Sequence, residues 1–169
     1  MDRRVRKTQS AIKTAFLQLL KTKEVKAIKV SEICSLADIN RGTFYLNYLD
    51  KYDLLEKIIS ESIERLIAEC SATTNTPQDS LNQTFQLIIE NKANYRTLIF
   101  ADKEGFFAKY LTQHILTLTA TEDLRDSAEA IFIANGIVGV LNYYLASERS
   151  SEAVLYEIES IVEKFRGGD

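Results

Sequence analysis

The sequence predicts an all-α protein, and three observations support this. Apolar residues recur three and four positions apart over long stretches, whereas the alternating patterns of strands are short and few. The 169 residues include one proline and six glycines, so few positions interrupt a helix. Apolar residues make up 46% of the chain and charged residues 27%, the mix of a globular protein with a real core. We therefore predict about nine helices.

Residues 8–23 form the first predicted helix. Thr8 can cap this helix by accepting a backbone N–H, and the apolar residues that follow repeat three and four positions apart. These residues are Ile12, Ala15, Phe16, Leu19 and Leu20. One face of the helix is therefore expected to be buried. The preceding segment, "DRRVRK" at residues 2–7, is basic and is expected to be a flexible arm.

Two short helices and a tight turn are predicted between Ser31 and Tyr48. Ser31 can cap the first helix, which runs to about residue 37, and Asn40 can cap the second. The turn needs Asp38 in a left-handed conformation, which Asp tolerates better than most residues. Two short helices joined by about three residues are typical of a helix-turn-helix unit.

A long helix follows this unit, and a polar loop separates it from the rest of the chain. Asp50 can cap the helix, with Asp53 three residues later in a capping-box arrangement, and the helix is expected to reach about residue 70. Residues 71–80 are polar, contain the single proline and are expected to form a loop. Further helices are predicted over residues 78–90, 93–100, 104–119, 123–146 and 152–165.

Charge divides the chain into two parts. Residues 1–57 hold 12 Lys and Arg against 7 Asp and Glu, a net charge of +5, whereas residues 58–169 hold 9 against 17, a net charge of −8. The total of −3 argues weakly against a nucleic-acid partner, but the asymmetry favours a basic binding domain on an acidic body. A chance fluctuation of surface charge is the alternative. We take residues 1–57 as the helix-turn-helix domain and residues 58–169 as a second, helical domain.

The second short helix carries more aromatic residues than a short buried helix needs. Phe44 and Tyr48 lie four residues apart and share one face, which we expect to lie in the core with Ile39. The remaining side chains point away from this face: Arg41, Thr43, Tyr45, Leu46 and Asn47. Core packing does not explain an exposed Tyr45 and Leu46, whereas docking in the major groove of DNA does.

Three of these positions suit contacts with bases. Arg41 can bind guanine through two hydrogen bonds, and Leu46 can touch a thymine methyl group. Gly42 has no side chain, so the helix backbone can approach bases or phosphates closely there.

Other positions suit phosphate. The hydroxyl groups of Thr43 and Tyr45 can bond phosphate oxygens, and Lys51 brings a cation to the free N–H groups that open the next helix. The predicted DNA-binding residues are Arg4, Arg6, Ser31, Arg41, Gly42, Thr43, Tyr45, Leu46, Asn47 and Lys51. The basic arm with Arg4 and Arg6 could instead be only a solvated tail.

The same residues follow a family pattern. From Gly42 the chain reads Gly-Thr-aromatic-Tyr-x-x-aromatic, Lys51 opens the next helix, and "VSEICSLADI" and "KYDLLEKI" flank the unit. Residues 7–58 thus resemble the DNA-binding domain of the TetR family of bacterial transcriptional regulators. Asp38 departs from the family, which often has glycine in the turn. The remaining two thirds of the chain match the family only in the number and length of their helices.

The resemblance implies a sequence-specific regulator, expected to be a repressor, that binds a palindromic operator in double-stranded DNA as a homodimer. Repression and activation stay open, because they depend on the position of the operator, and so does release by a small-molecule effector. The lack of a predicted membrane span or signal peptide predicts a cytoplasmic protein. In the family the last two long helices pair with those of the partner, and here these are residues 123–146 and 152–165. The apolar run at residues 131–145 suits this role because Gly136 and Gly139 allow close helix contact. An ordinary buried helix is the alternative. The predicted dimer residues are Ile131, Asn135, Gly136, Gly139, Tyr143, Leu155, Ile158 and Val162.

An effector pocket is predicted in the second domain, where aromatic residues surround the single histidine. Its predicted residues are Phe85, Tyr95, Phe107, Tyr110 and His114. The alternative is that these aromatics belong to the core and that His114 is a partly buried, hydrogen-bonded side chain.

Catalysis, cofactors and metals are not predicted. One histidine, two separated cysteines (Cys34 and Cys70) and no clustered carboxylates provide no triad, metal cage or acid–base pair. We expect no signal peptide and no membrane span, because no apolar run reaches about 18 residues. The alternative to a DNA-binding regulator is a TetR-like helical protein that acts as a coregulator through a protein partner.

Overall fold

The computed structural model describes residues 3–73, 77–119 and 127–147, together with residues 153, 156, 157 and 160. These described residues form helices, turns and loops, with no strand among them. The helices are α1 (Arg3–Leu20), the 3₁₀ turn η1 (Val25–Ala27), α2 (Val30–Leu36), α3 (Arg41–Tyr45), α4 (Lys51–Thr73), α5 (Pro77–Glu90), α6 (Lys92–Ala101), α7 (Phe106–Thr119) and α8 (Ala128–Ala146). The all-α prediction is confirmed.

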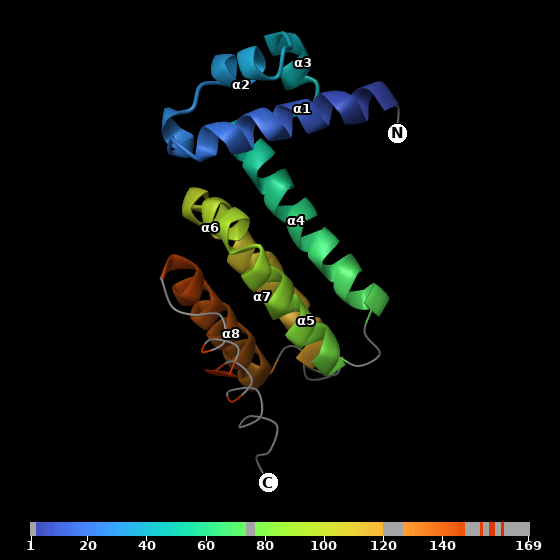
Figure 1. Ribbon diagram of the computed structural model, residues 1–169, viewed down its shortest axis with the longest axis vertical. Helices are drawn as coiled ribbons and strands as arrows, with labels where there is room; N and C mark the ends of the chain where they lie inside the picture. Colours follow the sequence, from blue (N-terminus) through green and yellow to red (C-terminus); the bar gives the residue numbers. More distant parts are fainter. Residues whose placement is uncertain are drawn as a thin grey trace.

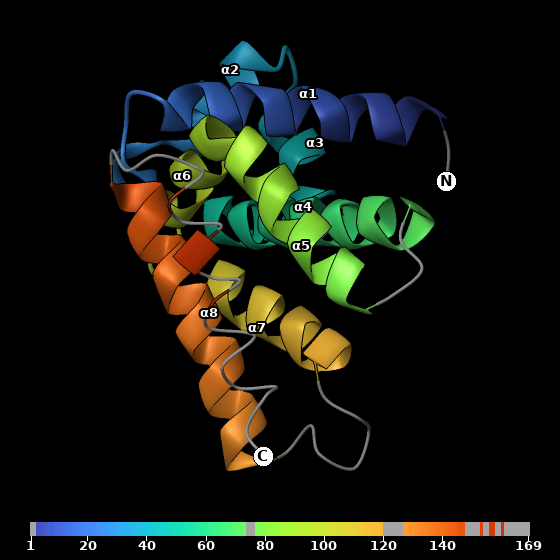
Figure 2. The ribbon, with the colours of Figure 1, turned by 60° about the horizontal axis from the view of Figure 1, so that its bottom comes forward.

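The helices form two groups joined by α4. Helices α1, α2 and α3 lie together at one end of the molecule, and α4 runs from this unit into the body (Figure 1). In the body, α7 packs against α4, α5 and α8, and α8 also packs against α6. The C-terminal end of α1 lies beside α6 in both views (Figures 1 and 2). The helix-turn-helix unit formed by α1, α2 and α3 therefore contacts the body through α4 and near α6.

Buried apolar side chains run through both groups. In the helix-turn-helix unit they come from α1, α2, α3 and the start of α4, and in the body from α5, α7 and α8. The largest of them are Phe16, Phe44, Phe85, Phe107 and Tyr144. Burial of a side chain of this size stabilises a fold by about 1.5–3 kcal/mol relative to exposure, so these contacts hold the helices in place.

Three predicted features at the start of the chain are wrong, and the first is the cap at Thr8, which lies inside α1. The basic arm is not separate, because α1 begins at Arg3 and includes the basic residues through Lys7. Arg and Lys are good helix formers, so a basic segment beside a helix can extend it. Helix α2 begins at Val30, where the Glu32 carboxylate accepts the N–H of Lys29 at 2.9 Å. Ser31 is therefore inside the first turn and is not the cap.

The predicted boundaries of later helices also shift. The polar segment 71–80 is mostly helical, since α4 extends through Thr73 and α5 begins at Pro77, a position that suits proline because the first turn needs no N–H donor. Helix α7 begins two residues later than predicted. Gly105 there has a φ of +77°, and the Asp102 carboxylate caps the helix. Most of the predicted helix 152–165 lies outside the described residues.

Candidate nucleic-acid interface

Helix α3 is anchored by the two aromatic residues predicted to lie in the core. Phe44 and Tyr48 are both buried, with ring centroids 5.8 Å apart. Burial raises the pKa of Tyr48 to about 12, and the charges of Glu61 and Asp53 add to this effect. Tyr48 is therefore neutral at physiological pH. The helix itself ends at Tyr45, three residues earlier than predicted, although the Tyr48 N–H still donates to the Phe44 carbonyl at 3.0 Å.

The turn before α3 has the predicted geometry. Asp38 is the one non-glycine residue with positive φ among the described residues, at +53°. Asn40 then caps α3 by accepting the Thr43 N–H at 2.8 Å. A Cβ added at Gly42 would lie 3.2 Å from Oδ1 of this cap, so the absence of a side chain there also protects the cap. The sequence did not reveal this second reason for the glycine.

Two of the predicted DNA-binding side chains already have hydrogen-bond partners in α3 or next to it. The Thr43 hydroxyl donates to Asn40 Oδ1 at 3.1 Å, and the Asn47 amide donates to the Thr43 carbonyl at 2.8 Å. Both bonds fix side chains at the surface that would face a groove. Each side chain keeps further hydrogen-bonding capacity for a phosphate oxygen.

The outer face of α3 presents a cation, a phenol and an apolar side chain. Leu46 is 87% exposed and Tyr45 is 48% exposed. A hydrogen bond with the Tyr45 side chain raises the pKa of Arg41, so the guanidinium lies over the same face and stays charged. Leu49, in the turn after α3, is also strongly exposed and was not predicted. Its one signal in the sequence was its place between the core residue Tyr48 and the cap residue Asp50, directly after α3.

Lys51 has a structural role that the sequence did not show. Its ammonium donates to the carbonyl oxygens of Lys26 and Ile28, each at 2.8 Å, and lies over the Tyr52 ring. The carbonyls come from η1 and the residue after it, so this side chain ties η1 to the start of α4. An ammonium has three N–H donors, and two are used here. One N–H remains for a phosphate oxygen.

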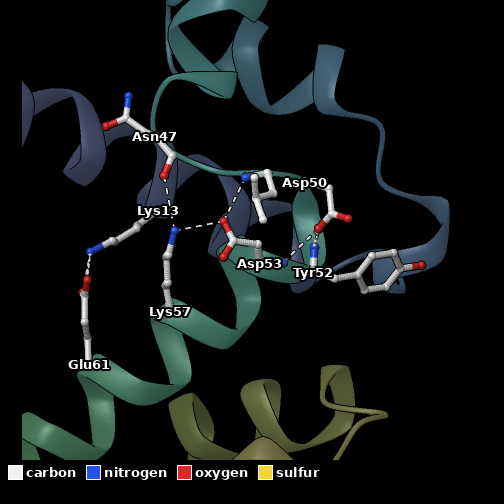
Figure 3. A network of polar contacts seen from close by, with 8 residues as sticks. Lys13, Asn47, Asp50, Tyr52, Asp53, Lys57 and Glu61 are labelled. Atoms are coloured by element: carbon white, nitrogen blue, oxygen red, sulfur yellow. Dashed lines mark hydrogen bonds and ion pairs between the residues drawn. The ribbon is translucent and has the colours of Figure 1, made fainter.

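A polar network fixes the turn between α3 and α4 (Figure 3). Asp50 Oδ1 accepts the N–H groups of Tyr52 and Asp53 at 2.7 and 2.9 Å, and Asp53 accepts the N–H of Leu49 at 2.9 Å. Lys57 binds Asp53 at 3.0 Å and lies near the Asn47 carbonyl. The predicted Asp50 cap is confirmed, whereas Asp53 accepts the N–H of Leu49, one residue before the cap, and so does not complete the predicted capping box.

One ion pair joins the first helix to the connecting helix. Lys13 of α1 binds Glu61 of α4, close to the network at the start of α4 (Figure 3). This ion pair joins α1 to α4, and the network around Asp50 and Asp53 joins α4 to the turn after α3. Together these contacts orient α3 relative to α1 and α4, as the reading of bases at defined positions requires.

The other predicted contact residues lie away from α3. Arg4 and Arg6 are exposed in the first two turns of α1, and Ser31 is exposed in the first turn of α2. The N-terminus of α1 lies at the same end of the molecule as α2 and α3 (Figure 1). These three residues thus share the recognition end of the molecule.

Solved structures share this arrangement of helices. A TetR transcriptional regulator from Streptococcus agalactiae 2603V has a TM-score of 0.73 and 23% identity, over 95% of this chain and 96% of that one. This chain has the TetR fold. Lin0861 from Listeria innocua, at 16% identity and a TM-score of 0.73, covers 97% of this chain with 93% of its own. The dihydroxyacetone kinase operon activator DhaS, at 23% identity and a TM-score of 0.68, covers 93% of this chain with 94% of its own.

A sequence relative is named as a regulator of the helix-turn-helix type. The uncharacterized HTH-type transcriptional regulator YxbF of Bacillus subtilis (strain 168) is 30% identical over 108 residues, 62% of this chain. The matched region spans 28% of the length of that relative. No family model matches the chain.

Within the TetR fold, the residues predicted for an effector pocket lie in different places. Phe85 and Phe107 are fully buried, and the Tyr95 ring meets Phe107 edge-on with centroids 5.7 Å apart. Tyr110 and His114 line a hollow of about 320 Å³ between α4 and α7. Two of the five side chains therefore share a hollow, and two belong to the core.

The single histidine is part of a buried polar cluster. His114 Nε2 lies 3.5 Å from the Thr84 hydroxyl, which donates to the Ser80 carbonyl at 2.7 Å and lies 3.3 Å from Cys70 Sγ. Burial lowers the pKa of His114. The side chain is therefore neutral at physiological pH.

The predicted dimer residues of α8 form an exposed face. Gly136 and Gly139 have no atom within 4 Å of an added Cβ, Tyr143 is 65% exposed, and Phe132, which was not predicted, is 68% exposed. Ile131 and Asn135 lie beside them and are exposed as well. The other face of α8 is buried, with Ala134, Ile137, Val138, Leu141, Tyr144 and Leu145 against the body. Leu155, Ile158 and Val162 lie outside the described residues.

The composition of α8 also meets the length and hydropathy of a membrane span. A window of 18 residues within this 19-residue helix has a mean hydropathy of 1.3, although the sequence analysis predicted no segment that meets these criteria. A helix that buries one face in a body and exposes an apolar second face has this composition without a membrane.

Proposed function

We propose that this chain is a sequence-specific transcriptional regulator that binds a palindromic operator in double-stranded DNA as a homodimer, and is not an enzyme. The observation that carries the proposal is the outer face of α3. Arg41, Tyr45 and Leu46 point outward from a helix that Phe44 and Tyr48 hold in the core. A guanidinium, a phenol and an apolar group on one exposed helix suit the base edges and phosphates of a major groove.

The face of α8 supports the homodimer. Phe132, Gly136, Gly139 and Tyr143 lie at spacings of four, three and four residues along one side of the helix. A protomer that exposes this face to water leaves a contiguous apolar patch, which marks a protein interface. Because a twofold dimer places the same surface on both partners, it would position two α3 helices for the two halves of a palindrome.

The direction of regulation follows from where the operator lies. We propose repression, because a dimer seated on a promoter blocks the polymerase, and a cytoplasmic location, where operators are found. DhaS, which has the same fold, is named an operon activator. An operator upstream of the promoter would make this chain an activator as well.

A second candidate function rests on the exposed leucines. Leu46 and Leu49 are 87% and 81% exposed at the recognition end, and such side chains also suit a protein groove. In this alternative the chain is a coregulator that binds a protein partner through the same surface.

Selection of bound sequences from random duplex DNA separates the two functions. The wild type should enrich a palindrome, and the Arg41→Ala variant should enrich a pool with weaker preference at one base pair of each half-site. Ser35→Ala, an exposed residue of α2, is the matched control and should enrich the wild-type palindrome. Enrichment of no sequence by the folded, dimeric wild type would exclude the DNA-binding function and favour the protein partner.

A further inference from the structure

A cavity lies between the helix-turn-helix unit and the body. Its volume is about 470 Å³, within the range of small-molecule sites. One wall comes from residues 20–26, at the end of α1 and in η1, and from Tyr52 and Leu55 of α4. The other wall comes from residues 96–104, in α6 and the turn after it, and from Phe106 of α7. This cavity is separate from the hollow beside Tyr110 and His114.

The interior of this cavity is apolar. Its lining includes Leu20, Val25, Leu55, Ala101 and Phe106, and the half-exposed rings of Tyr52 and Phe100 stand at its edge. An exposed phenyl group beside a hollow favours an apolar ligand, because a ligand body that covers the ring removes apolar surface from water.

Two of the three carboxylates that line the cavity already have partners within the protein. Glu24 pairs with Lys26 at 2.8 Å, and Asp102 accepts the N–H groups of Phe106 and Phe107 at 3.1 and 2.7 Å. Glu104 is the remaining acidic residue of the lining.

The lining of the cavity contains more basic than acidic side chains. Lys23 pairs with Glu32, and Arg96 lies over the Phe100 ring at 5.5 Å. Lys21 and Lys103 form no ion pair within the part of the chain that the structure describes. A hydrogen bond from Lys26 lowers the pKa of Glu24, and Lys103 adds to this effect from the opposite wall. Lys103 and the η1 residues Val25 and Lys26 all line the cavity.

From this geometry we infer that the cavity binds an apolar monocarboxylate, with its body between Leu55, Ala101 and Phe100 and its carboxylate toward Lys103 and Lys21. The two excess cations suit a single negative charge, and the apolar interior suits a flat aromatic ring or a short acyl chain. Both kinds of ligand share the chemistry that the site recognises.

One wall of the cavity belongs to the helix-turn-helix unit and the start of α4, and the other wall belongs to the body. The position of the first part relative to the second sets the direction of α3. Lys51 ties the η1 wall to the start of α4, next to α3. A ligand that fills the cavity would hold η1 at one distance from α6, and so would restrict the movement of the recognition helix relative to the body. This consequence rests on the proposed DNA-binding function, whereas binding of the carboxylate does not.

Isothermal titration calorimetry of the full chain without DNA tests the binding. Octanoate and 2-naphthoate are the probes, and 1-octanol and octylammonium are the controls for charge. We expect at least one carboxylate to bind at least tenfold more tightly than either control. A response to octanoate alone assigns an acyl chain, and a response to 2-naphthoate alone assigns an aromatic ring. Absence of binding by both, or equal binding of octanol, would overturn the inference.

Two substitutions locate the site. Lys103→Glu should weaken carboxylate binding at least tenfold, whereas Lys109→Glu, an exposed lysine of α7 outside the cavity, should leave it unchanged. Ala101→Leu should fill the cavity and weaken binding of the same probe, with folding checked by circular dichroism. Equal effects of Lys103→Glu and Lys109→Glu would show that the carboxylate binds elsewhere.

The regulatory consequence is measured separately, by operator affinity with and without the bound carboxylate. A change of threefold or more that disappears in Lys103→Glu supports it. Calorimetric binding with an unchanged operator affinity would retain the site and remove its regulatory role. A chain that binds carboxylate but no DNA would refute the proposed function alone.

Discussion

Helices α3 and α8 both leave one face exposed, and the two faces differ in chemistry. The face of α3 combines Arg41, Tyr45 and Leu46 with capped, hydrogen-bonded neighbours. The face of α8 is almost free of charge and includes two glycines without a neighbour within 4 Å of an added Cβ. A face with donors and a cation suits a polyanion, whereas an apolar face with small residues suits another helix. This difference in chemistry indicates a nucleic acid as the partner of α3 and another helix as the partner of α8.

The largest expected effect is on the face of α8. Phe132→Glu would leave an unpaired carboxylate in the proposed dimer seam, which costs about 3–5 kcal/mol for a buried charge without a partner. Sedimentation velocity over a range of concentrations should show a dimer for the wild type and a monomer for the variant. Phe100→Glu, at a half-exposed phenyl group of α6, is the matched control and should remain dimeric. A dimeric Phe132→Glu variant would place the interface elsewhere.

On the face of α3, Arg41→Ala should reduce operator affinity by about 10- to 100-fold per half-site, the loss typical of a bidentate base contact. Affinity for a scrambled duplex should fall much less, because that complex has no such base contact. Fluorescence anisotropy with both duplexes measures the two affinities. Equal losses on the two duplexes would show that Arg41 contacts the backbone and does not read a base.

Lys51→Ala should act on both folding and binding. Two carbonyl groups would lose their donor, so the free energy of unfolding should fall by about 1–3 kcal/mol. Affinity should fall alike on operator and scrambled duplex, and the slope of log K against log salt should flatten by about 1 per lost phosphate contact. Thermal melts and salt titrations separate the two effects. A large loss of stability with an unchanged salt slope would leave Lys51 with its structural role only.

The smallest expected effect is on stability in Gly42→Ala. Alanine gains about 1 kcal/mol of helix propensity over glycine, but the new Cβ would press on the Asn40 cap, so the net change should be within about 0.5 kcal/mol. Operator affinity should nevertheless fall, because the methyl group would stand between the helix backbone and the groove. Urea unfolding and anisotropy on the same preparation test this. Unchanged operator affinity would show that the glycine serves the cap alone.

The parts of the fold that follow from neighbouring residues could be predicted from the sequence. The cap at Asn40, the left-handed turn at Asp38 and the buried pair Phe44 and Tyr48 depend on spacings of two to four residues, and all three are confirmed. The same rules misplaced the start of α1, because a basic segment can be an arm or a helix with equal local preference.

Features that depend on distant contacts could not be predicted. The bonds of Lys51 reach carbonyls 23 and 25 residues earlier in the chain. The cavity beside η1 joins segments about seventy residues apart, so no local pattern in the chain marks it. Phe85 and Phe107 were predicted to line a pocket but lie in the core. The sequence could not separate the two cases, because an aromatic residue at helical spacing has the same pattern in a core as in a pocket.

Because α4 is long, a small tilt at one end produces a large displacement at the other end. Its 23 residues extend about 35 Å at the rise of an α-helix, from the body to the turn that holds α3. A tilt of about 5° about the body end of such a rod would carry its other end through about 3 Å. Hydrogen bonds to base edges tolerate a few tenths of an ångström. A change at the body end too slight to break any packing contact would therefore take the recognition helix out of register with its bases.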